Sequence, residues 1–161
     1  MFEFLKKRIT ADLLGIGLLA FASLPEEEQQ HLQTFLPEGI DPNSAFWDIF
    51  CLRVFAVDFA VWMALGDTST KNAVLDQFYA EVRQPLRDDA FDYVKARTLV
   101  YAVAVQTPHP NGIPYTVGKT FASLLTGADL PDVSVTLNGS ILFTGTFQAV
   151  TKTVKSFRIV P

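Results

Sequence analysis

The sequence predicts an all-α fold, a single-domain bundle of about seven helices packed around one apolar helix at residues 45–65. Apolar residues recur at intervals of three and four along most of the chain, which is the helical period. Hydrophobic residues make up 49% of the chain and charged residues 19%, a composition that excludes a disordered protein. A chain of 161 residues is long enough to bury one core, so we expect residues 1–161 to form one domain.

The first predicted element is an amphipathic helix that begins close to the N-terminus. Its apolar stripe starts at Phe2 and Leu5 and continues through Ile9, Leu13 and Ile16. Two glycines in its second half would let another backbone approach closely.

An alternative interpretation of the same segment is a cleaved secretory signal that ends near Ala22. Lys6, Lys7 and Arg8 precede an apolar run and a group of small residues, as in such signals. We favour a retained helix, because the stripe includes Phe2, and we therefore expect a soluble cytoplasmic protein. Insertion into a membrane is not expected, because the run of about 12 apolar residues falls short of the ~20 that a span needs.

A short helix is predicted next, between Ser23 and Leu36. Ser23 and Glu26 match a capping box, and Pro25 suits the first helical turn. Three consecutive glutamates follow at the positive end of the helix dipole, where carboxylates are stabilising.

The central helix, residues 45–65, is apolar apart from Asp48, Arg53 and Asp58. Asp41 and Pro42 ahead of it can cap and start the helix, and a glycine follows its end. Each of the three charges lies roughly 140° around the helix from the next, so no polar face exists. A helix that is apolar on all sides must be covered on all sides. We therefore expect Arg53 and Asp58 to be buried charges, each with its own partner on a neighbouring element, whereas Asp48 can remain in water near the helix start.

Three further helices are predicted before the C-terminal element. The first carries Leu75 to Val82 and ends before Pro85, and the second runs from Leu86 towards Gln106. Because Leu99 to Val105 are apolar on every side, we expect that end to lie beside the central helix. The third begins near Pro114 and is closed by Gly127.

The last element allows two interpretations. Five apolar residues between Phe143 and Phe157 fall at spacings of three and four, which favours a helix over about 139–157. The alternative is a short C-terminal β-hairpin within residues 131–145, because alternating valines and a leucine precede Asn138-Gly139.

The irregular loop at residues 108–114 contains three prolines and an Asn-Gly pair, and loops carry function more often than cores do. The candidate binding residues are therefore His109 and Asn111 on this loop, with Tyr115 and Lys119 just after it. The competing structural interpretation is a proline-stiffened connector between two helices.

A nucleotide site near Lys119 is a further hypothesis, based on Gly112 and Gly118-Lys119-Thr120. A phosphate-binding loop needs four residues between its first glycine and Gly-Lys-Thr, whereas five intervene here. Pro114 and Tyr115 would also crowd the loop, and the chain shows no series of strands for a parallel sheet.

Several classes of function find no support in the sequence. A net charge of −4 argues against a nucleic-acid surface. One cysteine, Cys51, and two distant histidines provide no metal-ligand pattern, so neither a metal nor a cofactor is expected. No recognisable acid–base or nucleophile arrangement is present, which favours a protein that is not an enzyme.

We therefore expect a non-enzymatic helical protein that acts through self-association, as a homo-oligomer, or through a protein partner. The 14 phenylalanines support this expectation if some of them reach the surface. The first alternative is a pocket between helices that binds a small apolar ligand or lipid, and the second is nucleotide binding near Lys119.

Overall fold

Seven helical segments and two four-residue strands form the structure, a computed structural model that describes residues 6–34 and 36–160. In chain order they are β1 (Lys7–Thr10), α1 (Ala11–Ala22), α2 (Glu26–Gln33), α3 (Pro42–Leu65), α4 (Ser69–Arg83), α5 (Asp88–Ala104), α6 (Gly112–Thr126), α7 (Val133–Ser156) and β2 (Phe157–Val160). Six of these described helices have 12 or more residues, and α2 has eight. The predicted all-α bundle is confirmed.

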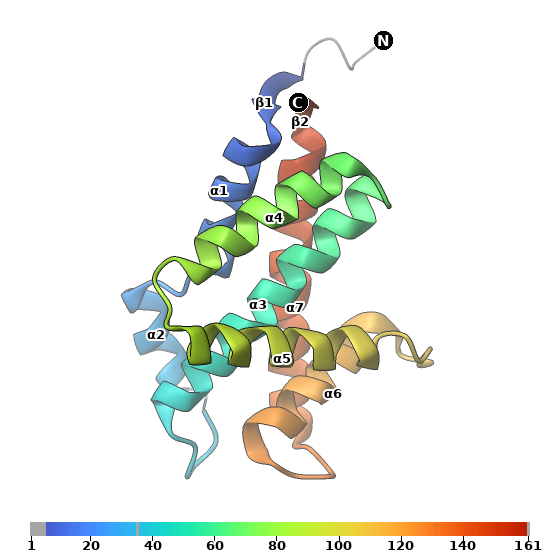
Figure 1. Cartoon of the computed structure of the whole chain (residues 1–161). Helices are drawn as coiled ribbons and strands as arrows, with labels where there is room; N and C mark the ends of the chain where they lie inside the picture. Colours follow the sequence, from blue (N-terminus) through green and yellow to red (C-terminus); the bar gives the residue numbers. More distant parts are fainter. Residues whose placement is uncertain (1–5, 35, 161) are drawn as a thin grey trace.

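The two longest helices, α3 and α7, run through the middle of the molecule (Figure 1). They share two hydrophobic clusters, one at each end of the bundle. At the end where the strands lie, α1 and α4 complete the first cluster, and at the other end α5 and α6 complete the second.

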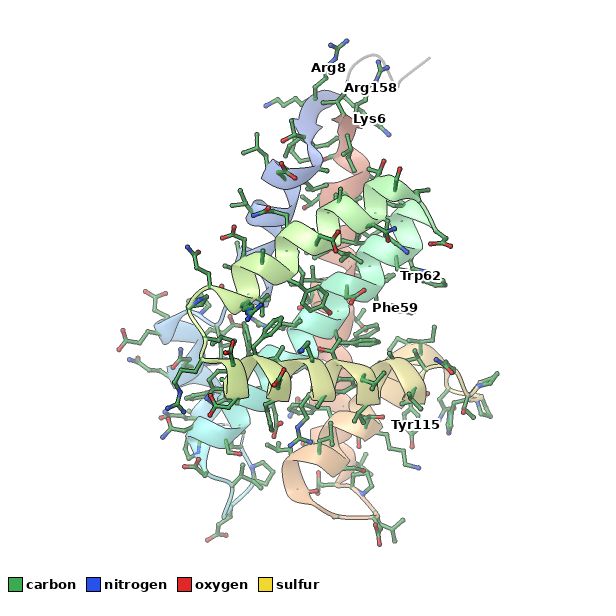
Figure 2. All side chains as sticks on the ribbon, viewed as in Figure 1. Lys6, Arg8, Phe59, Trp62, Tyr115 and Arg158 are labelled. Carbon is green, nitrogen blue, oxygen red and sulfur yellow. The ribbon has the colours of Figure 1, made fainter. Side chains whose placement is uncertain are left out.

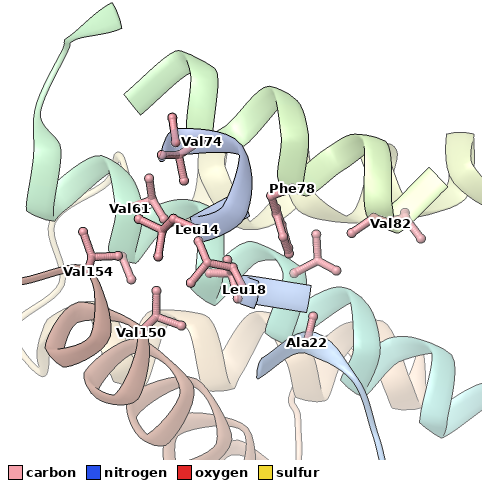
Figure 3. Packing of buried hydrophobic residues seen from close by; sticks show 14 of the residues in the cluster. Leu14, Leu18, Ala22, Val61, Val74, Phe78, Val82, Val150 and Val154 are labelled. Carbon is pink, nitrogen blue, oxygen red and sulfur yellow. The ribbon is translucent and has the colours of Figure 1, made fainter. Parts of the chain in front are cut away.

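The first cluster is built mostly from small and β-branched side chains of five helices, since Val94 of α5 also belongs to it (Figure 3). Leu14 and Leu18 of α1 insert between Val74 and Phe78 of α4 and Val150 of α7. All five are nearly inaccessible to water, and burying a leucine or phenylalanine side chain contributes about 1.5–3 kcal/mol.

The central position of α3 is confirmed, and the two clusters explain why this helix has no polar face. Cys51, Val54 and Val57 face the first cluster, whereas Leu52 and Phe55 face the second. Local signals set the ends of the helix: the Asp41 carboxylate accepts from the Ser44 amide at 2.8 Å, and Gly66 ends the helix at φ 64°.

Helices α6 and α7 cross closely at two glycines. A methyl group added at Gly118 would overlap the Ser140 hydroxyl and the Thr136 carbonyl of α7, and one at Gly139 would press on Phe121 of α6. The Asn138-Gly139 pair therefore belongs to a helix contact, and the alternative of a hairpin within residues 131–145 is wrong. Helix α7 begins at Val133, six residues before the predicted start.

The first predicted helix is wrong over residues 7–10. Phe2 and Leu5 lie outside the described residues, and Lys7–Thr10 form β1, which pairs in parallel with β2. The helix begins only at Ala11, where the Thr10 hydroxyl accepts from the Leu13 amide at 3.3 Å. The pairing joins the two ends of the chain, so no local pattern could have indicated it.

The predicted capping box of the second helix is also wrong. Ser23 ends α1, where its hydroxyl donates to the Leu19 carbonyl at 2.9 Å, and Pro25 stands at the N-cap of α2. Among the described helices, none combines the length and the apolar character that crossing a membrane requires.

Candidate functional site: an aromatic cleft

A ladder of stacked aromatic rings follows one side of α3. Phe55 stacks on Tyr101 of α5 with ring centroids 5.3 Å apart, and Phe59 stacks on Phe55 at 5.6 Å. Trp62 then stacks on Phe59 at 6.0 Å and is 47% exposed (Figure 2). Residues 55, 59 and 62 fall at spacings of four and three, which places them on one helix face.

A cleft of about 490 Å³ opens beside this ladder, between α3, α5 and the start of α6. It is lined by Phe55, Phe59, Trp62, Met63, Ala102, Val105 and Ile113, with Asp58, Thr98 and Gln106 as its polar groups. We call this space the aromatic cleft. Exposed apolar side chains mark its open side, since Met63 is 53% and Ile113 is 37% accessible to water.

Asp58 supplies the carboxyl group of the aromatic cleft. The Tyr79 hydroxyl of α4 donates to Asp58 Oδ2 at 2.6 Å. Burial raises the pKa of Asp58, although the hydrogen bond from Tyr79 and the charge of Lys71 act in the opposite direction. Burial and the neighbouring carboxylate likewise raise the pKa of the Tyr79 phenol. Asp58 is therefore a half-buried acceptor in an otherwise apolar wall.

Arg53, the second charge predicted to be buried, lies on a different side of α3. Its guanidinium donates to the Ser23 carbonyl at 2.8 Å and forms a two-pronged ion pair with Glu28 of α2. These partners are a helix-end carbonyl and a carboxylate, so the pair joins α1, α2 and α3 rather than forming a binding site.

Asp48, expected to remain in water, is instead buried at 3% exposure. Tyr93 donates to its Oδ1 at 3.0 Å, and the Arg97 guanidinium lies 3.3 Å from the same oxygen. Both residues belong to α5, which crosses the start of α3 and covers the carboxylate. Burial raises the pKa of Asp48, although the charge of Arg97 acts in the opposite direction. Burial and the charge of Asp48 together raise the pKa of the Cys51 thiol to about 12, so this thiol is unreactive.

The structure brings three of the four predicted binding residues together. The His109 and Tyr115 rings lie 4.7 Å apart, and the Asn111 amide donates to His109 Nδ1 at 3.1 Å. Lys119 lies one turn beyond Tyr115 on α6, and both line a smaller hollow of about 210 Å³ against Leu130 and neighbouring residues. These contacts stiffen the connection between α5 and α6, just outside the aromatic cleft.

The aromatic cleft was not predicted from the sequence, although one signal was present. The spacing of Phe55, Phe59 and Trp62 is visible in the sequence, but packing decides which face of α3 stays accessible. The end of α5 lies beside α3, as expected, because Tyr101 stacks on Phe55, but Leu99 and Val103 are 63% and 56% exposed.

The chemistry of the aromatic cleft is that of a binding site. Its walls offer ring faces and aliphatic groups, and Asp58 offers an oxygen that can accept a hydrogen bond. Within residues 6–34 and 36–160, no three His, Cys, Asp or Glu side chains gather as metal ligands. Comparison with known proteins gives no match among protein-family models, curated proteins or solved structures.

Proposed function

We propose that this chain is a non-enzymatic binding protein whose aromatic cleft takes a small apolar ligand. The observation that carries the proposal is the cleft itself, about 490 Å³ beside the ladder of Phe55, Phe59 and Trp62. This volume falls within the range of roughly 300–1,000 Å³ that is typical of ligand sites, and such sites combine apolar walls with a few polar groups.

The position of Asp58 indicates the polar end of the ligand. Tyr79 occupies one carboxyl oxygen, and the carboxyl group also lines the cleft, where it can accept a hydrogen bond from a ligand. A head group that donates, such as an amine, suits this position, whereas a carboxylate would meet a like charge. The proposed ligand is therefore an apolar molecule with a donor at one end.

A protein partner or a second copy of the chain is the other candidate, and a different surface favours it. Val133, Leu137 and Ile141 follow one face of α7 at intervals of four, and they are 73%, 54% and 68% exposed. Leu130, just before the helix, is 90% exposed. We call these four residues the α7 stripe; such exposed apolar groups are typical of association surfaces.

Native mass spectrometry of the purified protein tests both candidates, because it reports the number of subunits and any bound small molecule together. Two variants separate the sites: Ala102→Phe fills the aromatic cleft, and Leu137→Glu places a charge on the α7 stripe. We expect a bound small molecule that is lost in Ala102→Phe and retained in Leu137→Glu.

Other outcomes identify the candidate that is wrong. A dimer that dissociates in Leu137→Glu, with no bound small molecule in any variant, favours association through the α7 stripe and contradicts the ligand proposal. A bound molecule that survives in Ala102→Phe would place the ligand elsewhere.

A further inference from the structure

Lysine and arginine side chains without a counter-charge gather where the two ends of the chain meet. The chain has 13 lysines and arginines, and six of them lie at this end of the molecule, namely Lys6, Lys7, Arg8 and Arg158 in or beside the paired strands and Lys152 and Lys155 near the end of α7. We call these six the terminal cations. Six other cations form ion pairs, but within residues 6–34 and 36–160 no terminal cation does. Figure 2 shows Lys6, Arg8 and Arg158 together at this end of the molecule.

The register of the strands places two arginines directly opposite each other. Arg8 pairs with Arg158, and Ile9 pairs with Ile159. The isoleucines pack against the first hydrophobic cluster, so the arginines lie on the outer face of the sheet. Like charges directly opposite each other destabilise a sheet, and neither strand contains an acidic residue that could offset this repulsion.

A pocket of about 530 Å³ adjoins this arginine pair. Its polar lining consists of Lys6, Lys155 and Arg158 with Thr68 and Thr70 at the start of α4, and its apolar lining consists of Ala64, Leu65, Val154, Phe157 and Ile159. No acidic residue of the described chain is part of its lining. The positive end of the α4 dipole adds to the field of the three cations.

Asp67, which directly precedes Thr68 in the sequence, does not neutralise the positive charge of the pocket. It pairs with Lys71 at 2.9 Å and is 93% exposed in its side chain. The pocket therefore combines cations from both chain ends with two hydroxyl groups, and one of its cations, Arg158, is also opposed by Arg8 in the sheet.

We propose that this pocket binds the phosphate group of a small anion that carries at least two negative charges. Arg158 can hold a phosphate with two parallel hydrogen bonds, Lys6 and Lys155 act as point charges, and the threonine hydroxyls donate. The bound anion also offsets the repulsion between Arg8 and Arg158. A soluble phosphate compound and a phospholipid head group share this chemistry.

Isothermal titration of the full chain with pyrophosphate at low salt tests the pocket. We expect saturable binding to one site, weakened about tenfold or more in Arg158→Gln, because this change removes the two-pronged contact. The matched control is Lys119→Gln, since Lys119 is also a cation without an ion pair but lies on α6. Absence of binding, or equal weakening in the two variants, would overturn the proposal.

Thermal melts keep the test valid if a variant changes stability. Without phosphate, Arg158→Gln should melt no lower than the parent protein, because it removes the repulsion with Arg8. Pyrophosphate should raise the melting temperature of the parent and of Lys119→Gln but not that of Arg158→Gln. A rise of equal size in all three proteins would contradict a specific site.

Flotation with vesicles distinguishes the two sources of phosphate. One set contains phosphatidylcholine alone, and the other also contains phosphatidylinositol bisphosphate. Binding to the second set that pyrophosphate displaces assigns the pocket to a head group, and pyrophosphate binding without flotation assigns it to a soluble compound. Flotation with both sets of vesicles, or flotation that pyrophosphate does not displace, would contradict the phosphate pocket. Binding of the protein to duplex DNA that pyrophosphate does not displace would also contradict it.

Discussion

Replacing Arg53 by alanine should destabilise the protein by about 3 kcal/mol. The side chain of Arg53 is 11% exposed and makes three hydrogen bonds, one to the Ser23 carbonyl and two to Glu28. Hydrogen bonds to charged groups contribute about 1.5–3 kcal/mol each. The sum must be reduced, because Glu28 is 37% exposed and can regain water once its partner is gone.

The same contacts explain why the loss should be felt in α2 first. This helix has no fully buried residue, so the ion pair between Glu28 and Arg53 is a main attachment to the bundle. Hydrogen exchange of the α2 amides should therefore accelerate in Arg53→Ala more than exchange of the α4 amides does.

Urea denaturation with linear extrapolation measures the loss, and Arg83→Ala is the matched control. Arg83 pairs with Asp88 at 3.1 Å, but the two side chains are 62% and 87% exposed, so its removal should change stability by at most about 0.5 kcal/mol. If Arg53→Ala costs no more than Arg83→Ala, the reasoning about buried charges on α3 is refuted.

Two further predictions concern packing and pH. Gly118→Ala should lower the free energy of unfolding by about 2 kcal/mol because the added methyl group overlaps α7, whereas Gly17→Ala should raise it by about 0.5–1 kcal/mol because no atom lies within 4 Å of the added methyl group. Urea denaturation of both variants measures these changes, and equal effects would contradict the close crossing of α6 and α7. Burial raises the pKa of Asp58 in the folded protein above its ordinary value of 3.8, so the folded state favours the protonated carboxyl group. The stability that the protonated group contributes is complete at a pH below the pKa of the unfolded chain, and it is lost as the pH rises through the pKa of the folded protein. Asp58→Asn should therefore gain in stability relative to the parent as the pH rises from about 4, and denaturation at a series of pH values would reveal an unchanged or opposite difference.

The extent of α3 could be predicted because its signals are local. Asp41, Pro42 and Gly66 stand beside the helix ends in the sequence, and the absence of a polar face indicated burial. Most of the helix is buried, but the expected cover on all sides is wrong for Trp47, Trp62 and Met63, which are 39%, 47% and 53% exposed. The burial of Arg53 could be inferred for the same reason, whereas the identity of Glu28 as its partner depends on packing.

The features that could not be predicted depend on contacts between distant parts of the chain. The strand Lys7–Thr10 pairs with Phe157–Val160 at the other end of the sequence, and each strand is too short to show a period. Asp48 is buried only because Tyr93 and Arg97, about 45 residues later, cover it. The aromatic cleft also depends on the packing of distant segments, because α5 lies against α3 but leaves Trp62 partly exposed.

Tryptophan fluorescence tests the central claim, a ligand site in the aromatic cleft, most directly. The chain has two tryptophans, so Trp47→Phe leaves Trp62 as the single reporter. Titration with dodecylamine should give a saturable blue shift that Ala102→Phe abolishes, and dodecanoate should bind more weakly unless Asp58 is changed to asparagine. If the Trp62 emission does not respond to either probe, or if it responds equally in Ala102→Phe, the aromatic cleft is not a ligand site.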